Sequence, residues 1–422
     1  MTHTINRRTA LTALGAAGAA LATGIRPAAA QSTELSFWTW RQEDRTQYAE
    51  LFGMFTRDNP GIRFAFQGFE PQNYGTALST ALAAGRGPDV IHIRAYGGLE
   101  QFSKAGYLEP LSPQTVPELA NYTPSALASV TDRSDRKPYA VPFASQTLGI
   151  FYNRDVLSRN GVQPPETWDQ LIAACKALKD KGVIPLANGM ATAFMAEIFT
   201  AALTLPLHGK AFNDDLVAGK ATFEDPRYVG ALAKLLELRE YMPPGFTGID
   251  YPTMQQLFLS GRAAMFVGGS FEIANFRRQN ANLPMEFMAP PAPTAGAPRL
   301  VPVFYDGGYA VNAKSDKKEA ALKLIRFFST PAFGNKFTEL LGNISPIAGV
   351  RIADPMLARV AELNKTSGDH ITLVHFRYQS PTGSELLTAG VQKLMGGSAT
   401  PAQVAKEVTD GIATYHAPFR RG

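Results

Sequence analysis

The hydrophobic positions of the chain alternate between two periods. Residues 34–40, Glu-Leu-Ser-Phe-Trp-Thr-Trp, alternate polar and apolar side chains and predict a strand. Over 48–55 the apolar residues recur at i, i+3, i+4 and i+7, which is the pattern of an amphipathic helix. Strand, helix and strand patterns follow over 62–67, 74–82 and 90–93. Strands that alternate with helices indicate βαβ units around a parallel sheet.

Two segments interrupt this alternation. The first, 138–152, has extended patterns over 138–143 and 147–152 with no helix between them. The second, 289–298, contains four prolines, which favours an extended segment that crosses between lobes. We therefore expect an α/β fold of two lobes joined by hinge crossings. The ligand cleft is expected between the lobes, beyond the carboxyl ends of the strands. The expected boundaries place 31–141 and 289–345 in lobe 1 and 142–288 and 346–422 in lobe 2.

Residues 1–30 have the features of an export signal peptide. The pair Arg7-Arg8 precedes a weakly apolar stretch, and Ala28-Ala29-Ala30 offers small residues to a signal peptidase. The paired arginines favour the twin-arginine route, and an ordinary secretory signal is the alternative. Either route predicts a mature chain that begins near Gln31 and acts in the periplasm.

The composition excludes several classes of protein. With 45% hydrophobic and 18% charged residues, the chain has the make-up of a folded globular protein and lacks that of a disordered one. Its formal charge of +5 falls to +2 without the three arginines of the leader, and no basic run suggests nucleic-acid binding. Cys175 is the only cysteine, which excludes an internal disulfide.

The sequence carries none of the usual catalytic or metal-binding motifs. It has no HExxH and no GxxxxGK[ST], and Gly268–Glu272 fails the GxSxG pattern at its last position. His370 and His375 lack a common metal-ligand spacing. We therefore expect no metal, no cofactor and no catalytic residue. A pair of carboxylates acting as in a glycosidase is the alternative that the sequence does not exclude.

Four motifs occur in a characteristic order. They are Gly85–Ile91 (GRGPDVI), Pro138–Phe143 leading to Ile150–Asp155 (IFYNRD), Pro165–Leu171 (PETWDQL) and Gly261–Met265 (GRAAM). Their order and spacing resemble the extracellular solute-binding proteins of ABC importers, in the carbohydrate-binding branch that includes maltose-binding protein. The resemblance implies a monomer of two α/β lobes that holds a sugar between them and delivers it to the importer's membrane subunits.

Sugar recognition needs aromatic faces for C–H surfaces and bidentate polar groups for hydroxyls. The resemblance places such groups on loops after the strands, with Trp40 and Phe271 as aromatic faces. Many relatives have Trp at the position of Phe271. The expected ligand-binding residues are Trp40, Arg41, Gln42, Arg94, Tyr96, Gln146, Asn188, Ser270, Phe271, Asp306, Gly307, Gly308, Arg377 and Tyr378.

Some of these positions carry alternatives. Gln146 stands where maltose-binding protein has a carboxylate near the hinge, and Gly307-Gly308 forms either a close backbone approach to the ligand or a tight turn. The arginines Arg41, Arg94 and Arg377 keep open an anionic ligand such as a phosphorylated sugar alcohol. A secreted carbohydrate-active enzyme is the third alternative.

Overall fold

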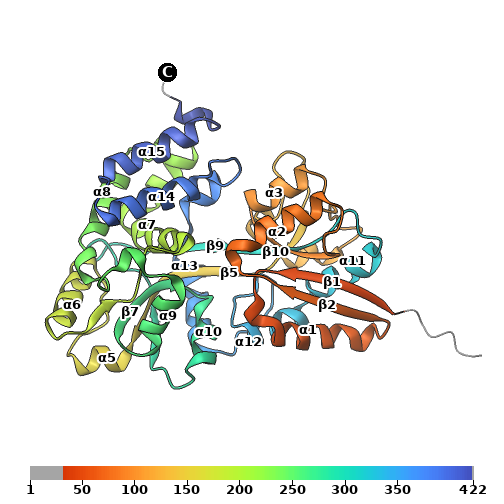
Figure 1. Ribbon diagram of the computed structural model, residues 1–422, viewed down its shortest axis with the longest axis horizontal. Helices are drawn as coiled ribbons and strands as arrows, with labels where there is room; N and C mark the ends of the chain where they lie inside the picture. Colours follow the sequence, from red (N-terminus) through yellow and green to blue (C-terminus); the bar gives the residue numbers. More distant parts are fainter. Residues whose placement is uncertain (1–31, 421–422) are drawn as a thin grey trace, which may run out of the picture.

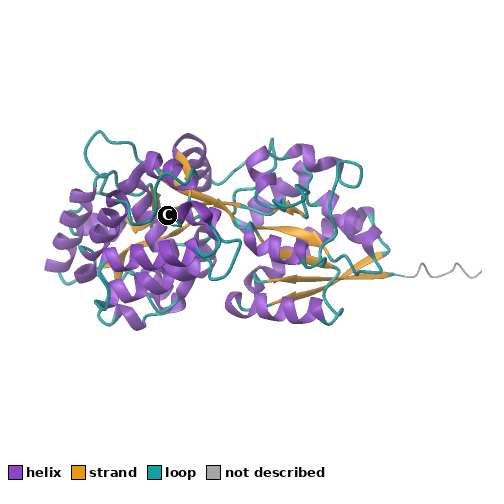
Figure 2. Cartoon of the chain, turned by 90° about the horizontal axis from the view of Figure 1, so that it is seen from above, coloured by secondary structure: helices purple, strands orange, loops and turns teal. Residues whose placement is uncertain are grey.

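The structure is a computed structural model that describes residues 32–420, so the predicted signal peptide lies outside the described residues. Two α/β bodies lie side by side, each with its own sheet (Figure 1). Strands pass between the bodies at a narrow junction, which is also seen from above (Figure 2). The predicted α/β fold with two lobes is confirmed.

The sheet of the first lobe has the strand order β2-β1-β3-β10-β4. Strands β1 (Thr33–Thr39), β2 (Ile62–Gly68) and β3 (Val90–Arg94) are parallel, as the βαβ pattern predicts. Strand β10 (Gly307–Val311) runs antiparallel between β3 and β4 (Ala140–Pro142). The helices of this lobe are α1 (Arg45–Asp58), α2 (Pro71–Ala83), α3 (Gly97–Lys104), α4 (Pro124–Ala128), α11 (Lys318–Phe327) and α12 (Pro331–Leu341).

The sheet of the second lobe has the order β11-β9-β5-β7-β6, with β8 also paired to β5. Strand β5 (Ser145–Asn153) is its centre and runs antiparallel to its three partners. The other strands are β6 (Ile184–Leu186), β7 (Ala263–Gly269), β8 (Met285–Met288), β9 (Val301–Tyr305) and β11 (Gly368–His370). The helices are α5 (Arg154–Arg159), α6 (Trp168–Asp180), α7 (Ala193–Val217), α8 (Pro226–Leu236), α9 (Tyr251–Leu259), α10 (Glu272–Gln279), α13 (Pro355–Ser367), α14 (Gly383–Gly396) and α15 (Pro401–Ala413).

The first lobe has apolar clusters on both faces of its sheet. Tyr309 of β10 packs in the cluster of α1, α11 and α12, whereas its neighbour Ala310 packs with α2 and α3. Successive residues of β3 divide in the same way, Val90 to one face and Ile91 to the other. A sheet buried on both faces explains why these strands are continuously apolar in sequence.

The chain passes between the lobes three times. It leaves the first lobe between β4 and β5 and returns between β9 and β10. It leaves again after α12, where the N–H of Ser145 donates to the carbonyl of Ile344 at 2.9 Å. Figure 1 shows β5 and β9 reaching from one body toward the other.

The predicted crossing at 289–298 is wrong. Strand β9 pairs with β5, with Phe304 opposite Gln146, so the chain stays in the second lobe until Tyr305. The proline-rich segment lies along that lobe, where the N–H of Trp168 donates to the carbonyl of Ala292. Prolines favour extended backbone whether a segment joins two lobes or covers one, so the pattern could not distinguish the two cases. The other predicted boundaries remain proposals.

Among residues 32–420, no helix is both long enough and apolar enough to span a membrane.

The lobes also touch away from the crossings. Gly97 begins α3 in the first lobe, and a Cβ placed on it would lie 1.7 Å from the carbonyl oxygen of Arg377 in the second lobe. Beside this contact, the guanidinium of Arg133 lies 3.1 Å from the ring centroid of Tyr378. Gly97 is therefore required by the close approach of the two backbones.

This contact predicts the effect of Gly97→Ala. The new methyl meets backbone atoms, which cannot move aside as a flexible side chain would, so we expect the lobes to separate and the radius of gyration in solution X-ray scattering to increase. Gly75→Ala in α2 is the control, because a Cβ there meets no atom within 4 Å. Scattering profiles of Gly97→Ala that match those of the unmodified chain would contradict the contact.

Candidate functional site

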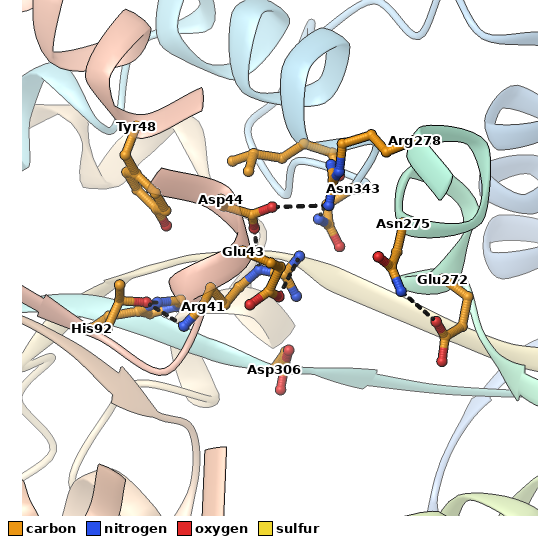
Figure 3. Close-up of polar contacts among 12 residues, drawn as sticks. Arg41, Glu43, Asp44, Tyr48, His92, Glu272, Asn275, Arg278, Asp306 and Asn343 are labelled. Atoms are coloured by element: carbon orange, nitrogen blue, oxygen red, sulfur yellow. Dashed lines mark hydrogen bonds and ion pairs between the residues drawn. The ribbon is translucent and has the colours of Figure 1, made fainter. Parts of the chain in front are cut away.

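Charged side chains of both lobes meet beside the crossings (Figure 3). Arg41 of the first lobe donates to Asp44 at 2.5 Å and lies 3.5 Å from Glu43. On the other side, Arg278 of α10 in the second lobe reaches Asp44 at 3.2 Å. The Asp44 side chain is fully buried, and two guanidinium groups stabilise its charge. Arg278–Asp44 is thus an ion pair that links the lobes.

A second group of charges lies at the return crossing. The guanidinium of Arg94 stacks 3.8 Å from the ring centroid of Trp40 and donates to Asp306 at 3.0 Å. Beneath Trp40, the ring of His92 stacks at 3.7 Å. Trp40 is only 3% exposed, so the aromatic face predicted from sequence is covered by Arg94 in this structure.

Arg377 reaches a carboxylate of its own lobe. Its Nη2 donates to Glu197 at 2.6 Å and its Nε donates to Ser384 at 2.8 Å. Tyr378 contacts the opposite lobe through Arg133. Each of the arginines Arg41, Arg94 and Arg377 therefore has a carboxylate partner.

Gln146 and Ser270 lie within the hinge. Gln146 donates to Asn343 at 2.9 Å and accepts from the Ser270 hydroxyl at 2.8 Å, and Ser270 in turn accepts from the N–H of Thr147 at 3.1 Å. All of these side chains are buried. Their hydrogen bonds join β5, the start of α10 and the third crossing, which gives Gln146 and Ser270 a part in fixing the hinge.

Two other predicted residues make contacts within their own lobes. Asn188 is fully buried and bonds both the carbonyl and the N–H of Val267, each at 2.8 Å, so it holds the segment after β6 against β7. Gln42 is exposed and donates to Glu70 at the start of α2.

The expectation of a loop or tight turn at Gly307-Gly308 is wrong, because both residues belong to β10. A Cβ on Gly307 would lie 2.8 Å from the Trp40 ring, and one on Gly308 would lie 2.7 Å from the carbonyl oxygen of Val141. The glycines let β10 pack closely between β3 and β4. Asp306, directly before them, stays at the junction of the lobes.

Tyr96 holds an unusual backbone conformation, with φ at 58°. Non-glycine residues in this region cost about 1–3 kcal/mol and occur where the surroundings fix them. Here the N–H of Tyr96 donates to Ser129 at 2.7 Å, and its hydroxyl accepts from the N–H of Tyr305 at 3.2 Å. Tyr96 therefore connects the first lobe to the end of β9.

Aromatic side chains of the second lobe are partly exposed, and among them Tyr251 is one that the sequence did not indicate. Phe194, at the start of α7, is 40% exposed and packs edge-on against Tyr251 at 5.1 Å between ring centroids. Phe271 is half-buried and its ring lies over Gly269. A single Phe at a helix start is as typical of a core as of a surface, so the sequence alone did not decide whether Phe194 is exposed.

Glu272 is buried between α9 and α10. It accepts from the hydroxyl of Tyr251 at 2.5 Å and from Gln255 at 3.0 Å. Burial raises the pKa of Glu272 to about 7, and the hydrogen bonds from Tyr251 and Gln255 oppose that rise. In the sequence, Glu272 is marked only by its position directly after Phe271, and this position does not indicate that its carboxylate is buried.

The raised pKa predicts how stability depends on pH. An unfolded Glu ionises near about 4.3, so between that pH and about 7 the unfolded chain loses this proton while the folded chain keeps it. Folding therefore loses stability as pH rises through this window. The side chain of Glu272→Gln stays neutral at every pH. We therefore expect the variant to become more stable relative to the unmodified chain between pH 4.5 and pH 7, by up to about 3 kcal/mol in unfolding free energy, and its melting temperature to rise relative to that of the unmodified chain over the same range.

Glu319→Gln is the matched control, because this side chain is 89% exposed on α11. Its effect on the melting temperature should stay small across the same pH range. A constant difference between Glu272→Gln and the unmodified chain at every pH would contradict the raised pKa.

Comparisons with known proteins agree with the motifs found in the sequence. A family model described as bacterial extracellular solute-binding protein matches residues 39–334, well over half of the chain. The multiple sugar-binding protein of Streptococcus mutans is 22% identical over 422 residues, and the match covers 96% of each chain. The maltotriose-binding protein of Pyrococcus abyssi is 27% identical over 278 residues, which covers 64% of this chain and 56% of that protein.

A solved structure shares the fold. The bacterial solute receptor AcbH, described as having an exclusive preference for β-D-galactopyranose, matches with a TM-score of 0.79 at 20% identity, over 92% of this chain and 100% of that chain. The family resemblance predicted from sequence is confirmed. The chain belongs to the bacterial extracellular solute-binding protein family.

Proposed function

We propose that this chain captures a neutral sugar between its two lobes and delivers it to the membrane subunits of an ABC importer. The observation that carries the proposal is the presence of a charged pair at the junction of the lobes together with partly exposed aromatic rings on the second lobe. The first lobe contributes Arg94 and Asp306, and the second contributes the partly exposed rings of Phe194 and Phe271. Aromatic faces match the C–H surfaces of a sugar, and the charged pair matches its hydroxyls.

The balance of charge favours a neutral ligand over an anionic one. Arg41, Arg94 and Arg377 are each held by a carboxylate, so an incoming phosphate would have to displace Asp44, Asp306 or Glu197. Leaving such a carboxylate unpaired and partly buried is costly. A sugar hydroxyl can instead donate to the carboxylate and accept from the arginine while the ion pair stays intact.

Binding without turnover is the second part of the proposal. The family is one of solute-binding proteins, and the relatives named above are sugar-binding proteins. The relatives' ligands, maltotriose and multiple sugars, support a carbohydrate rather than another solute. We further propose that the lobes rotate about residues 143–145 and Asp306 to enclose the ligand.

The proposal predicts which compounds stabilise the chain. In a thermal-shift panel, neutral sugars such as D-galactose, raffinose and maltotriose are the candidates, and sorbitol 6-phosphate represents the anionic polyols. A ligand at a concentration of a hundred times its Kd adds about 2.7 kcal/mol to the unfolding free energy and so raises the melting temperature. We expect a shift with at least one neutral sugar and none with the phosphate. A shift with sorbitol 6-phosphate alone would contradict the neutral-ligand proposal.

For a sugar that gives a shift, the aromatic faces are tested by calorimetric titration. Phe194→Ala should weaken binding by about 5- to 150-fold, since a stacking aromatic contributes about 1–3 kcal/mol. Val217→Ala is the control, because Val217 is also exposed, at 44%, but lies at the far end of α7. If Phe194→Ala and Val217→Ala bind the sugar with equal affinity, Phe194 does not contact the ligand.

We also propose that the chain reaches the periplasm by the twin-arginine route. The double variant Arg7→Lys with Arg8→Lys keeps the positive charge of the leader and removes its guanidinium groups. A twin-arginine leader should then fail and leave precursor in the cytoplasm, whereas an ordinary secretory leader needs only positive charge. Fractionation of cells that express each form measures the outcome, and a normal periplasmic yield of the double variant would contradict this route.

A further inference from the structure

Trp40 is enclosed on both of its faces. The ring of His92 stacks against one face at 3.7 Å, nearly parallel at 24°, and the guanidinium of Arg94 covers the other at 3.8 Å. The edge of the indole meets β10, where a Cβ on Gly307 would approach it to 2.8 Å. Of these neighbours, Arg94 alone is substantially open to solvent, with 45% of its side chain exposed.

The position of Arg94 is fixed by a residue of the crossing. Its Nη1 donates to Oδ1 of Asp306, the single residue between β9 and β10. The ion pair holds the guanidinium plane over the indole, where stacking and charge both contribute. Moving Arg94 aside would cost both contacts at once.

An uncovered indole at the end of a strand, beside the junction of two lobes, would be a platform for a sugar ring. Arg94 occupies that platform. We propose that Arg94 sets the size limit of the ligand, because it fills the face of Trp40 on which a further sugar ring would otherwise stack. This inference rests on the proposed function and adds to it that the ligand is a short sugar whose rings stack on the second lobe.

The covering of Trp40 by Arg94 can be tested without a ligand. Removing the Arg94 side chain should expose the Trp40 ring. Trp38 packs at a tilt against Phe69 and Trp168 is buried, so the exposure of these two rings should stay the same. Acrylamide quenching of tryptophan fluorescence should therefore increase in Arg94→Ala. Arg94→Lys should give an intermediate increase, because it keeps the charge opposite Asp306 but loses the planar group. Arg86→Ala, an exposed arginine of the same lobe, should leave quenching unchanged.

The size limit is measured by calorimetric titration with sugars that differ by one ring, namely D-galactose, melibiose and raffinose, and D-glucose, maltose and maltotriose. In the series that binds, we expect the unmodified chain to prefer a shorter member. Arg94→Ala should shift the affinity ratio toward the member with one more ring by about 5- to 10-fold. Arg86→Ala should keep the original ratio.

Unchanged quenching in Arg94→Ala would overturn the inference, because Trp40 would not be covered in solution. Increased quenching with an unchanged affinity ratio would overturn the size limit, although Arg94 would still cover Trp40. If neither the unmodified chain nor the variant binds a sugar of either series, the proposed function and the size limit both fail, and the quenching result still decides whether Arg94 covers Trp40.

Discussion

The return of the chain from the second lobe to the first constrains the whole junction. Strand β9 pairs with β5 in one sheet and β10 pairs with β3 and β4 in the other, with Asp306 alone between them. A single residue cannot move far from two ladders of hydrogen bonds. Its carboxylate is therefore held between the lobes, within reach of Arg94, and the glycines that follow bring β10 against Trp40.

The charges around this junction are arranged in pairs. Arg41 and Arg278 share Asp44, Arg94 has Asp306, Arg377 has Glu197, and a further buried carboxylate, Glu272, lies among hydrogen-bond donors. Burying an unpaired charge is far more costly than burying a hydrogen-bonded pair. Each of these arginines has a carboxylate partner, so the number of arginines at the junction does not by itself indicate an anionic ligand.

The sequence predicted the fold class, the two lobes and the family, because each of these is encoded in local patterns. The hydrophobic periods along 34–93 and the motifs at Gly85–Ile91 and Gly261–Met265 depend only on nearby residues. The return crossing was misplaced because an extended segment does not reveal its pairing partner. Gly307 and Gly308 show the same limit, since glycine pairs are typical of turns but here serve close strand packing.

For the candidate site, the sequence by itself determined which residues lie near the ends of strands, and Trp40, Arg94, Asp306 and Arg377 do lie at or beside the junction. Only the tertiary structure decided what each side chain touches. Asn188, Gln146 and Ser270 use their polar atoms within the protein, and Phe194 is exposed rather than buried. Local sequence sets backbone direction and periodicity, whereas a side chain's partners come from segments far along the chain, as with Arg94 and Asp306.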